Sequence, residues 1–176
     1  MRKCLGFKRK DVELRALEPE DLSYFLKWEN DTEIWGFGSQ IQPLSRFLVR
    51  EYLNQSLNSD VMSMKQVRFV IEYKGQVAGC IDYFDYDSLN RRASLGILID
   101  ENFRKQGIAS QAIALLLEYG YNYLNLHQVY VHIPSDNQPS VNLFESMDFQ
   151  FIGELKDWVF RSGTYHHVKL FQYIFK

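Results

Sequence analysis

The feature that most constrains this chain is an apolar run followed by a polar loop and a long helical pattern. The run Leu95-Gly96-Ile97-Leu98-Ile99 carries no polar side chain, which is typical of a strand buried on both faces. A polar loop follows, and beyond Gly107 apolar residues recur at helical spacing as far as about Tyr123. A buried strand joined to an amphipathic helix in this way predicts an α/β fold, in which helices pack on a sheet.

Other periodic segments surround this unit. Alternating or continuous apolar residues predict strands at 11–17, 67–73, 76–85, 91–99 and 129–133, and two more within 149–176 joined by a turn at 161–164. Helices are expected from 18–21 to Asn30-Asp31, at 44–57 with Phe47, Leu48 and Tyr52 as its apolar face, at 107–123, and through Ser140 to Met147 behind an Asp136-Asn137 cap. A loop is expected at 33–42. The order is β α α β β β α β α β β, which predicts one domain over 1–176: a mixed sheet with helices on both faces.

Composition narrows the class of protein. A length of 176 residues suits one domain, and 46% hydrophobic with 24% charged residues disfavours disorder. A net charge of −2 argues against sequence-independent binding to nucleic acid. The longest apolar run, at 112–117, is far too short to cross a membrane, so no membrane partner is expected.

Cysteine and histidine usage gives no sign of a metal. Cys4 and Cys80 lie far apart, which predicts free thiols in a reducing cytoplasm and a core position for Cys80. His166 and His167 are adjacent on a predicted strand, so they point to opposite faces. The remaining pair, His127 and His132, also lacks ligand spacing.

The polar loop has the strongest chemical signal, Arg104-Lys105-Gln106-Gly107-Ile108-Ala109. The start of a helix offers free N–H groups, Gly107 allows a ligand close to the backbone, and the two basic residues add positive charge. A pyrophosphate suits such a loop, although a plain basic loop has the same composition. The Gly-Lys-Ser/Thr of a Walker loop and the three-glycine dinucleotide fingerprint are both absent from this loop.

Several motifs, in order along the chain, resemble the GNAT N-acetyltransferases. Arg104-x-x-Gly107-x-Ala109 resembles their acyl-CoA signature, and residues 91–99 resemble the strand before it. Asn137-x-x-Ser140-x-x-Leu143-Phe144 with Phe149 is similar to the family's second motif. Residues 14–22 and Gly163-x-Tyr165-x-x-Val168 resemble the branch that contains spermidine and ribosomal-protein N-terminal acetyltransferases.

This resemblance implies a GNAT-like mixed sheet whose fourth and fifth strands splay apart, with acetyl-CoA as cosubstrate in the gap. The pantetheine is expected to pair with the backbone at the end of the fourth strand, and a backbone N–H near Ile99 to polarise the thioester carbonyl. The implied cofactor residues are Ile97, Leu98, Ile99, Arg104, Lys105, Gln106, Gly107, Ile108, Ala109, Ser110, Asn137, Ser140 and Phe144.

Two positions depart from the family pattern. Phe144 stands where the family commonly has a Tyr that protonates the leaving thiolate, and Ser94 stands where a Glu often serves as base. No catalytic residue is therefore assigned. Candidate replacements are Asp82, Tyr83, Tyr130 and Glu33. Because general acid–base help is worth about 10²–10⁴-fold, its loss would slow transfer without abolishing it.

The acceptor is expected to be a primary amine, preferably a small amine or polyamine. Glu33, Trp35 and Asp82 are the candidate acceptor residues. The acids Glu29, Asp31, Glu33, Asp82, Asp85 and Asp87 could hold a polycation or form an ordinary solvated face, and Trp35 with Phe37 could form a lid or a tucked-in loop.

Three alternatives stay open. They are a peptide N-terminus as acceptor, an acyl-CoA-binding module with little or no catalysis, and a purely structural interaction domain. The family resemblance also makes a homodimer through sheet edges plausible.

Overall fold

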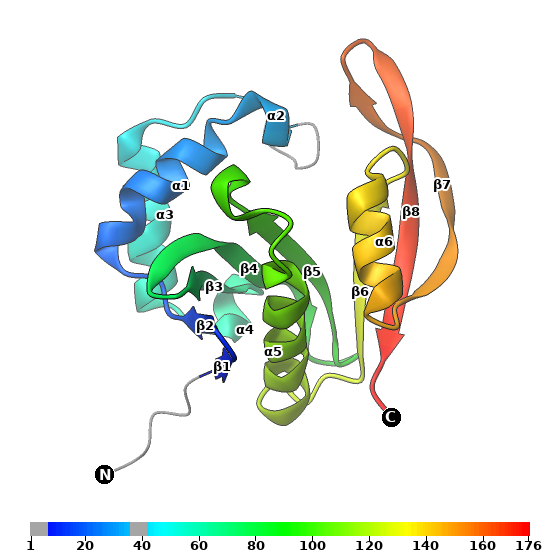
Figure 1. The fold of residues 1–176 in the computed structure, drawn as a ribbon, viewed down its shortest axis with the longest axis horizontal. Coiled ribbons are helices and arrows are strands. Elements are labelled where there is room, and N and C mark those ends of the chain that lie inside the picture. The colour runs from blue at the N-terminus through cyan, green and yellow to red at the C-terminus, as the bar shows by residue number, and fades with distance from the viewer. Residues whose placement is uncertain (1–6, 36–41) are drawn as a thin grey trace.

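The computed structural model describes residues 7–35 and 42–176, apart from the side chains of residues 33, 34 and 57. Its eight strands form one sheet in the order β1-β2-β3-β4-β5-β6-β8-β7 (Figure 1). Neighbouring strands are antiparallel except for the parallel pair β5 and β6. The predicted mixed sheet is confirmed. The strands are β1 (Phe7–Arg9), β2 (Val12–Arg15), β3 (Val67–Tyr73), β4 (Gln76–Asp87), β5 (Arg92–Ile99), β6 (Gln128–Pro134), β7 (Gln150–Arg161) and β8 (Thr164–Ile174).

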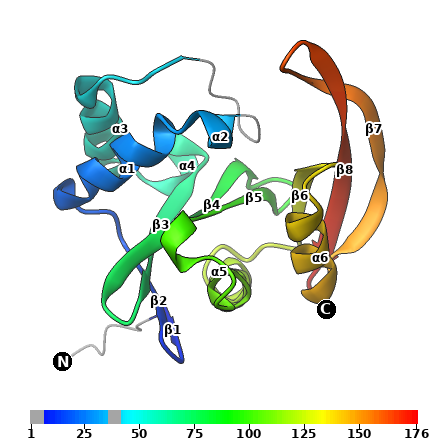
Figure 2. The ribbon, with the colours of Figure 1, turned by 45° about the horizontal axis from the view of Figure 1, so that its top comes forward.

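Helices cover both faces of this sheet, as predicted (Figure 2). One core lies beneath α5 and α6 and includes Ile113, Leu116 and Phe144. The other lies beneath α1 and α3, where Phe25 and Leu53 belong to the same cluster as Val70 and Cys80 of the sheet. The helices are α1 (Leu22–Glu29), α2 (Thr32–Trp35), α3 (Arg46–Asn58), α4 (Val61–Met64), α5 (Ile108–Asn122) and α6 (Gln138–Ser146), with 3-10 turns η1 (Pro19–Asp21) and η2 (Glu101–Phe103).

The parallel pair β5 and β6 separates after three rungs. Arg92 to Ser94 of β5 pair with Gln128 to Tyr130 of β6, and no later residue of β5 pairs with β6. Beyond Ser94, β5 stays paired with β4 while β6 stays paired with β8. The expected splay is therefore confirmed. It also makes one prediction wrong: residues 96–99 are only half-buried, because β6 no longer covers that edge.

The apolar face predicted for the second helix was wrong at Phe47 and Leu48 and right at Tyr52, which is half-buried and packs against the α1–α3 core. Phe47 and Leu48 are exposed (66% and 48%), whereas Val49 and Leu53 are 2% exposed. The Ser45 side chain caps the helix by accepting a hydrogen bond from the Leu48 N–H. Residues four apart share one helix face, so Val49 and Leu53 together contact the core on the α1 side.

Three short elements were not predicted. β1 extends the sheet edge by pairing with β2. α2 occupies part of the predicted 33–42 loop, and α4 follows Asp60, whose carboxylate accepts a hydrogen bond from the Ser63 N–H. Elements of three or four residues are too short to show a period. Cys4 and Phe37 lie outside the described residues, so their predicted roles stay predictions.

Two leucines of α3 test this arrangement. Leu53→Ala is expected to lower the free energy of unfolding by about 2–5 kcal/mol, because it leaves a cavity in the α1–α3 core. Leu48→Ala, on the same helix but largely in solvent, is expected to change it by no more than about 0.5 kcal/mol. Urea unfolding of both variants measures the difference, and equal losses would contradict the packing of α3.

Candidate active site

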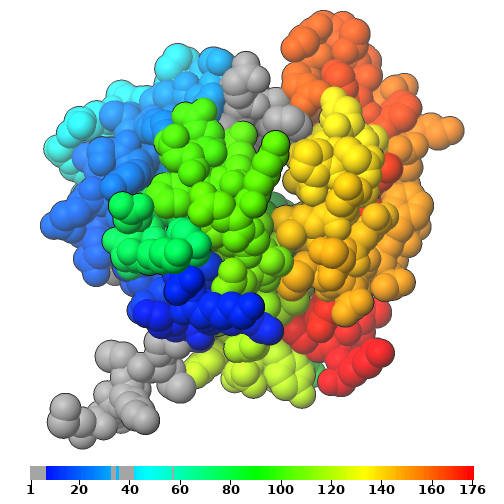
Figure 3. Space-filling view, in the orientation of Figure 1, coloured from blue at the N-terminus to red at the C-terminus, as the bar shows by residue number. Residues whose placement is uncertain are grey.

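A cleft of about 780 Å³ lies where β5 and β6 separate. Figure 3 shows α5 (green) and α6 (yellow) on either side of this opening. Both strands line the cleft, and so do α6, the β7–β8 hairpin and residues from α1, β3 and β4. The cleft therefore runs through the gap in the sheet, from the face covered by α6 to the face covered by α1. The lining includes Gly96 and Ile97 of β5, His132 and Ile133 of β6, Asn137, Ser140 and Phe144 of the α6 side, and Trp158 of the hairpin.

Asp100 anchors the loop that leaves β5. Its Oδ2 accepts hydrogen bonds from Lys27 Nζ (2.8 Å) and Trp28 Nε1 (2.9 Å) of α1, and its Oδ1 accepts one from the Asn102 N–H. Burial would raise the pKa of Asp100, but these hydrogen bonds hold it down at about 2. A charged carboxylate thus ties α1 to the start of the loop.

The loop ends in an open helix N-terminus. Lys105 (φ 61°) and Gly107 (φ 70°) adopt left-handed conformations that turn the chain into α5. Gly107 is the N-cap residue and has no side chain to cap the first N–H groups, while exposed Arg104, Lys105 and Gln106 precede it. The Gly107 carbonyl is occupied by Ser110 Oγ (3.0 Å) and Gln111 Nε2 (3.1 Å). Unpaired helix N–H groups beside two cations suit an anionic ligand.

The α6 wall of the cleft comes from the second sequence motif. Asn137 caps α6 as predicted, and its Oδ1 accepts a hydrogen bond from the Ser140 N–H at 3.3 Å. The Phe144 ring is 2% exposed and packs edge-on against Phe149, with ring centroids 5.0 Å apart. Asn137, Ser140 and Phe144 thus line one side of the cleft from successive turns of the helix.

A buried arginine organises the opposite side. Arg68 on β3 donates two hydrogen bonds to Asp82 Oδ2, at 3.1 and 2.9 Å, and lies 3.5 Å from Glu29 Oε1. Its guanidinium stands over the rings of Phe25 (5.8 Å) and Tyr52 (5.3 Å). Burial lowers the pKa of Arg68, but the Asp82 charge outweighs this effect and raises it, so the group stays cationic.

Sequence reasoning missed Arg68. The signal was present, because a single arginine interrupts the apolar strand 67–73 directly opposite Asp82 across the Lys74-Gly75 hairpin. Opposite charges at such paired positions attract one another.

The structure separates the candidate proton carriers. Asp82 lines the cleft, but Arg68 and Gln66 both donate to its Oδ2. Tyr83 is wrong as a candidate: it is fully buried on the other face of the sheet, where its O–H donates to the Leu116 carbonyl at 2.9 Å. Burial also raises the pKa of Tyr83. The Glu33 side chain lies outside the described residues.

Ser94 and Tyr130 form the last rung before the strands separate. Ser94 is 1% exposed, and its Oγ has no hydrogen-bond partner among the described residues. Burial raises the pKa of Tyr130. Neither group is therefore a ready base at neutral pH.

The remaining acceptor-side candidates differ in whether they line the cleft. Trp35 lines the cleft, and its indole N–H donates to the Glu29 carbonyl at 2.7 Å. Glu29 also lines the cleft, whereas Asp87 pairs with Arg92 at 3.2 Å away from it.

The cysteine and histidine side chains have ordinary structural positions. Burial raises the pKa of Cys80 to about 12, which suits the predicted core thiol and no nucleophile. His166 and His167 have different neighbours, Asp136 and Asp157, as their opposite orientations require. Within residues 7–35 and 42–176, no three His, Cys, Asp or Glu side chains gather closely enough to hold a metal ion. Nor is any helix in those ranges long and apolar enough to cross a membrane.

Several known proteins are similar to this chain in sequence and in fold. The spermidine N(1)-acetyltransferase of Escherichia coli K12 is 28% identical over 156 residues, covering 89% of this chain and 82% of that protein. The crystal structure of spermidine N-acetyltransferase from Vibrio cholerae, in complex with CoA and spermine, superposes with a TM-score of 0.85 at 27% identity, covering 94% and 96% of the two chains. RimL, a ribosomal L7/L12 α-N-protein acetyltransferase, shares the fold with a TM-score of 0.83 at 20% identity, covering 94% and 95%.

The family model described as an acetyltransferase (GNAT) domain matches residues 11–150. That span begins just before β2 and ends at the start of β7, so it contains the separated strands, the Gly107 loop and α6. The chain therefore belongs to the GNAT acetyltransferase family.

Proposed function

We propose that this chain, acting as one catalytic domain, transfers the acetyl group of acetyl-CoA to a primary amine of a polyamine. One observation carries the proposal: a cleft lined by carboxylates and aromatic rings runs along the separated edge of β5, and that strand leads through a short loop into the open, basic N-terminus of α5. An acyl carrier held at one end would therefore present its acetyl group to an amine held at the other. Holding both reactants in line supplies much of the acceleration of such a reaction.

The cofactor end has two complementary parts. The α5 N–H groups after Gly107, together with Arg104 and Lys105, suit the pyrophosphate. The edge of β5 from Leu95 to Ile99 has no strand partner on its β6 side among the described residues, so its amides can pair with an extended pantetheine. Asn137 and Ser140 face this path from α6.

The acceptor end suits a cation. Glu29 and Asp82 bring two carboxylates against the single cation Arg68, which leaves an excess of negative charge. Trp28, Trp35 and Trp158 line the same cleft, and aromatic faces attract ammonium groups. A polyamine has several such groups, and the related V. cholerae enzyme was crystallised with spermine. These features favour a polyamine over a neutral acceptor.

An acceptor panel tests the function directly. We expect mass spectrometry after incubation with acetyl-CoA to show acetylated spermidine or spermine, with much less product on a peptide α-amine. Product on the peptide alone would show that the acceptor is a protein N-terminus rather than a polyamine. CoA binding without any acetylated amine would favour a binding module, and no CoA binding would leave only a structural domain.

Two glycines test the cofactor end. Gly107→Val is expected to weaken CoA binding at least about 10-fold, which is about 1.4 kcal/mol, because its side chain projects into the open space above the α5 N-terminus. Gly163→Val, at the tip of the β7–β8 hairpin, has a similar positive φ (81° against 70°) and open surroundings, so it carries similar backbone strain. Calorimetry should show unchanged CoA affinity for Gly163→Val. Equal affinities for the two variants would exclude the Gly107 site.

Phe144 tests whether a proton donor is missing. Phe144→Tyr places a hydroxyl in the cleft wall, and we expect kcat to rise about 10-fold because the leaving thiolate then receives a proton. Phe149→Tyr is the matched control, since it adds the same hydroxyl to the neighbouring buried ring outside the cleft lining. A kcat that rises equally in both variants, or in neither, would contradict the donor role assigned to this position.

A further inference from the structure

We propose that His132 is the general base of this enzyme and takes a proton from the substrate ammonium. The inference rests on the proposed function, because it concerns the same cleft and the same reaction. His132 takes the role of base, which a Glu often has in this family and which Ser94 cannot perform here. The inference comes from the arrangement of β5 and β6 rather than from a sequence motif. His132 was considered in the sequence only as a metal ligand.

The register places His132 at the fork between the strands. Ser94 and Tyr130 form the last rung, so the next positions on the same face of the sheet are Gly96 on β5 and His132 on β6. These two positions no longer pair, because the strands have separated, and both line the cleft. His132 therefore faces the gap where the acetyl group and the amine are expected to meet.

Gly96 leaves room for the Asp82 side chain at the edge of this gap. A Cβ built on Gly96 would lie 2.6 Å from Asp82 Oδ1 and 3.3 Å from the Phe84 ring, so a side chain there would collide with the acceptor wall. Across from that wall stands the imidazole of His132. Asp82 thus bounds the gap on one side as a fixed negative charge, and His132 bounds it on the other as a neutral acceptor.

The surroundings of His132 favour the neutral imidazole. His132 is exposed to solvent on one side, but its partial burial lowers its pKa below the usual value for histidine, and Asp85 of β4 opposes this effect only in part. The Tyr130 ring meets the imidazole edge-on with centroids 5.6 Å apart, and the position opposite on β8 is the uncharged Leu170.

Two further ionic groups lie across the cleft, Glu29 and the Arg68–Asp82 pair, and their charges sum to one negative charge. Asp85 is the charged group that raises the pKa of His132, and partial burial outweighs it, so at neutral pH the imidazole can accept a proton.

The other candidates in the cleft are less suitable. Asp82 is paired with Arg68, so its charge is better placed to hold an ammonium than to deprotonate it. Burial raises the pKa of Tyr130, and a serine hydroxyl such as Ser94 accepts a proton poorly at neutral pH. His132 is the imidazole that lines the cleft among the described residues.

The step balances without another reactant. A ring nitrogen of His132 takes one proton from the ammonium, and the neutral amine attacks the thioester carbonyl carbon. The C–N bond forms and the C–S bond breaks. The second proton of the attacking nitrogen passes to the thiolate, which leaves as CoA thiol. The imidazolium then releases its proton to water, so the net reaction yields amide, thiol and one proton.

Steady-state kinetics with spermidine and acetyl-CoA test this role. His132→Gln is expected to lower kcat by about 10²–10⁴-fold, with an unchanged KM for acetyl-CoA and unchanged CoA affinity by calorimetry. Between about pH 5 and about pH 9, wild-type kcat/KM should rise through the low pKa of His132 and then level off, because the base accepts the proton of the bound ammonium. In His132→Gln this rise should vanish, and activity should increase only as the amine itself loses its proton in solution. Added imidazole should restore part of the activity of His132→Ala.

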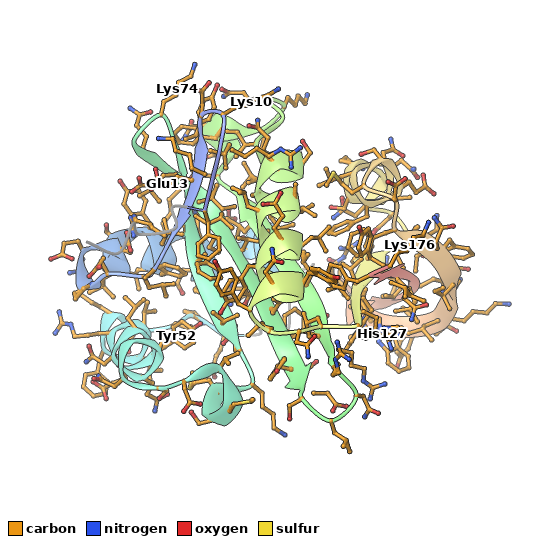
Figure 4. The ribbon with its side chains drawn as sticks, turned by 90° about the horizontal axis from the view of Figure 1, so that it is seen from below. Lys10, Glu13, Tyr52, Lys74, His127 and Lys176 are labelled. Carbon is orange, nitrogen blue, oxygen red and sulfur yellow. The ribbon has the colours of Figure 1, made fainter. Side chains whose placement is uncertain are left out.

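His127→Gln is the matched control. His127, labelled in Figure 4, lies just before β6, whereas the β6 residues that line the cleft, 131–134, lie at the far end of that strand. The His127 backbone N–H donates to the Arg91 carbonyl. His127→Gln is expected to retain full activity and the wild-type pH profile. If wild type acetylates spermidine and His132→Gln does so equally well with the same pH profile, His132 is not the base. If wild type binds CoA and acetylates no amine, the proposed function itself fails.

Discussion

The structure depends on the point at which β5 and β6 stop sharing backbone hydrogen bonds. Each strand keeps its other neighbour, β4 or β8, so the two halves of the sheet are held while the gap between them stays open. A backbone edge without a strand partner offers amide groups to a ligand of extended shape. The cleft, the exposure of residues 96–99 and the facing positions of Gly96 and His132 all follow from this one separation.

Two ionic contacts fix the acceptor side of the cleft relative to β5. Asp100 binds the side chains of Lys27 and Trp28, which fixes α1 to the end of β5 beside the Gly107 loop. Arg68 joins β3 to Asp82 of β4 and to Glu29 of α1. A buried pair of this kind costs desolvation energy, and removing one partner leaves an unpaired charge. These contacts therefore set where carboxylates face the cleft, which is the property that favours a cationic substrate.

The chemistry of the cleft follows from what each position can do with a proton. Phe144 cannot donate one, and the buried Ser94 hydroxyl is a poor acceptor. A thiolate leaves without prior protonation more readily than an alkoxide or amide, so the missing donor slows the reaction more than it changes its course. The amine, in contrast, must lose a proton before it can attack. A base on β6 in place of one on β5 would meet that need from the other side of the same gap.

Local patterns in the sequence were sufficient for much of the fold and for the elements that surround the proposed cofactor end of the site. The strand predicted at 67–73 coincides with β3, Asn137 caps α6, and the basic loop at Gly107 leads into α5, because periodicity, capping and turn residues act over a few neighbours. Tertiary structure alone decided that Val49 rather than Phe47 faces the core, that Tyr83 points away from the cleft, and that His132 stands opposite Gly96. Those outcomes depend on how strands and helices far apart in the chain pack together, and the sequence of one segment does not determine which neighbour it will contact.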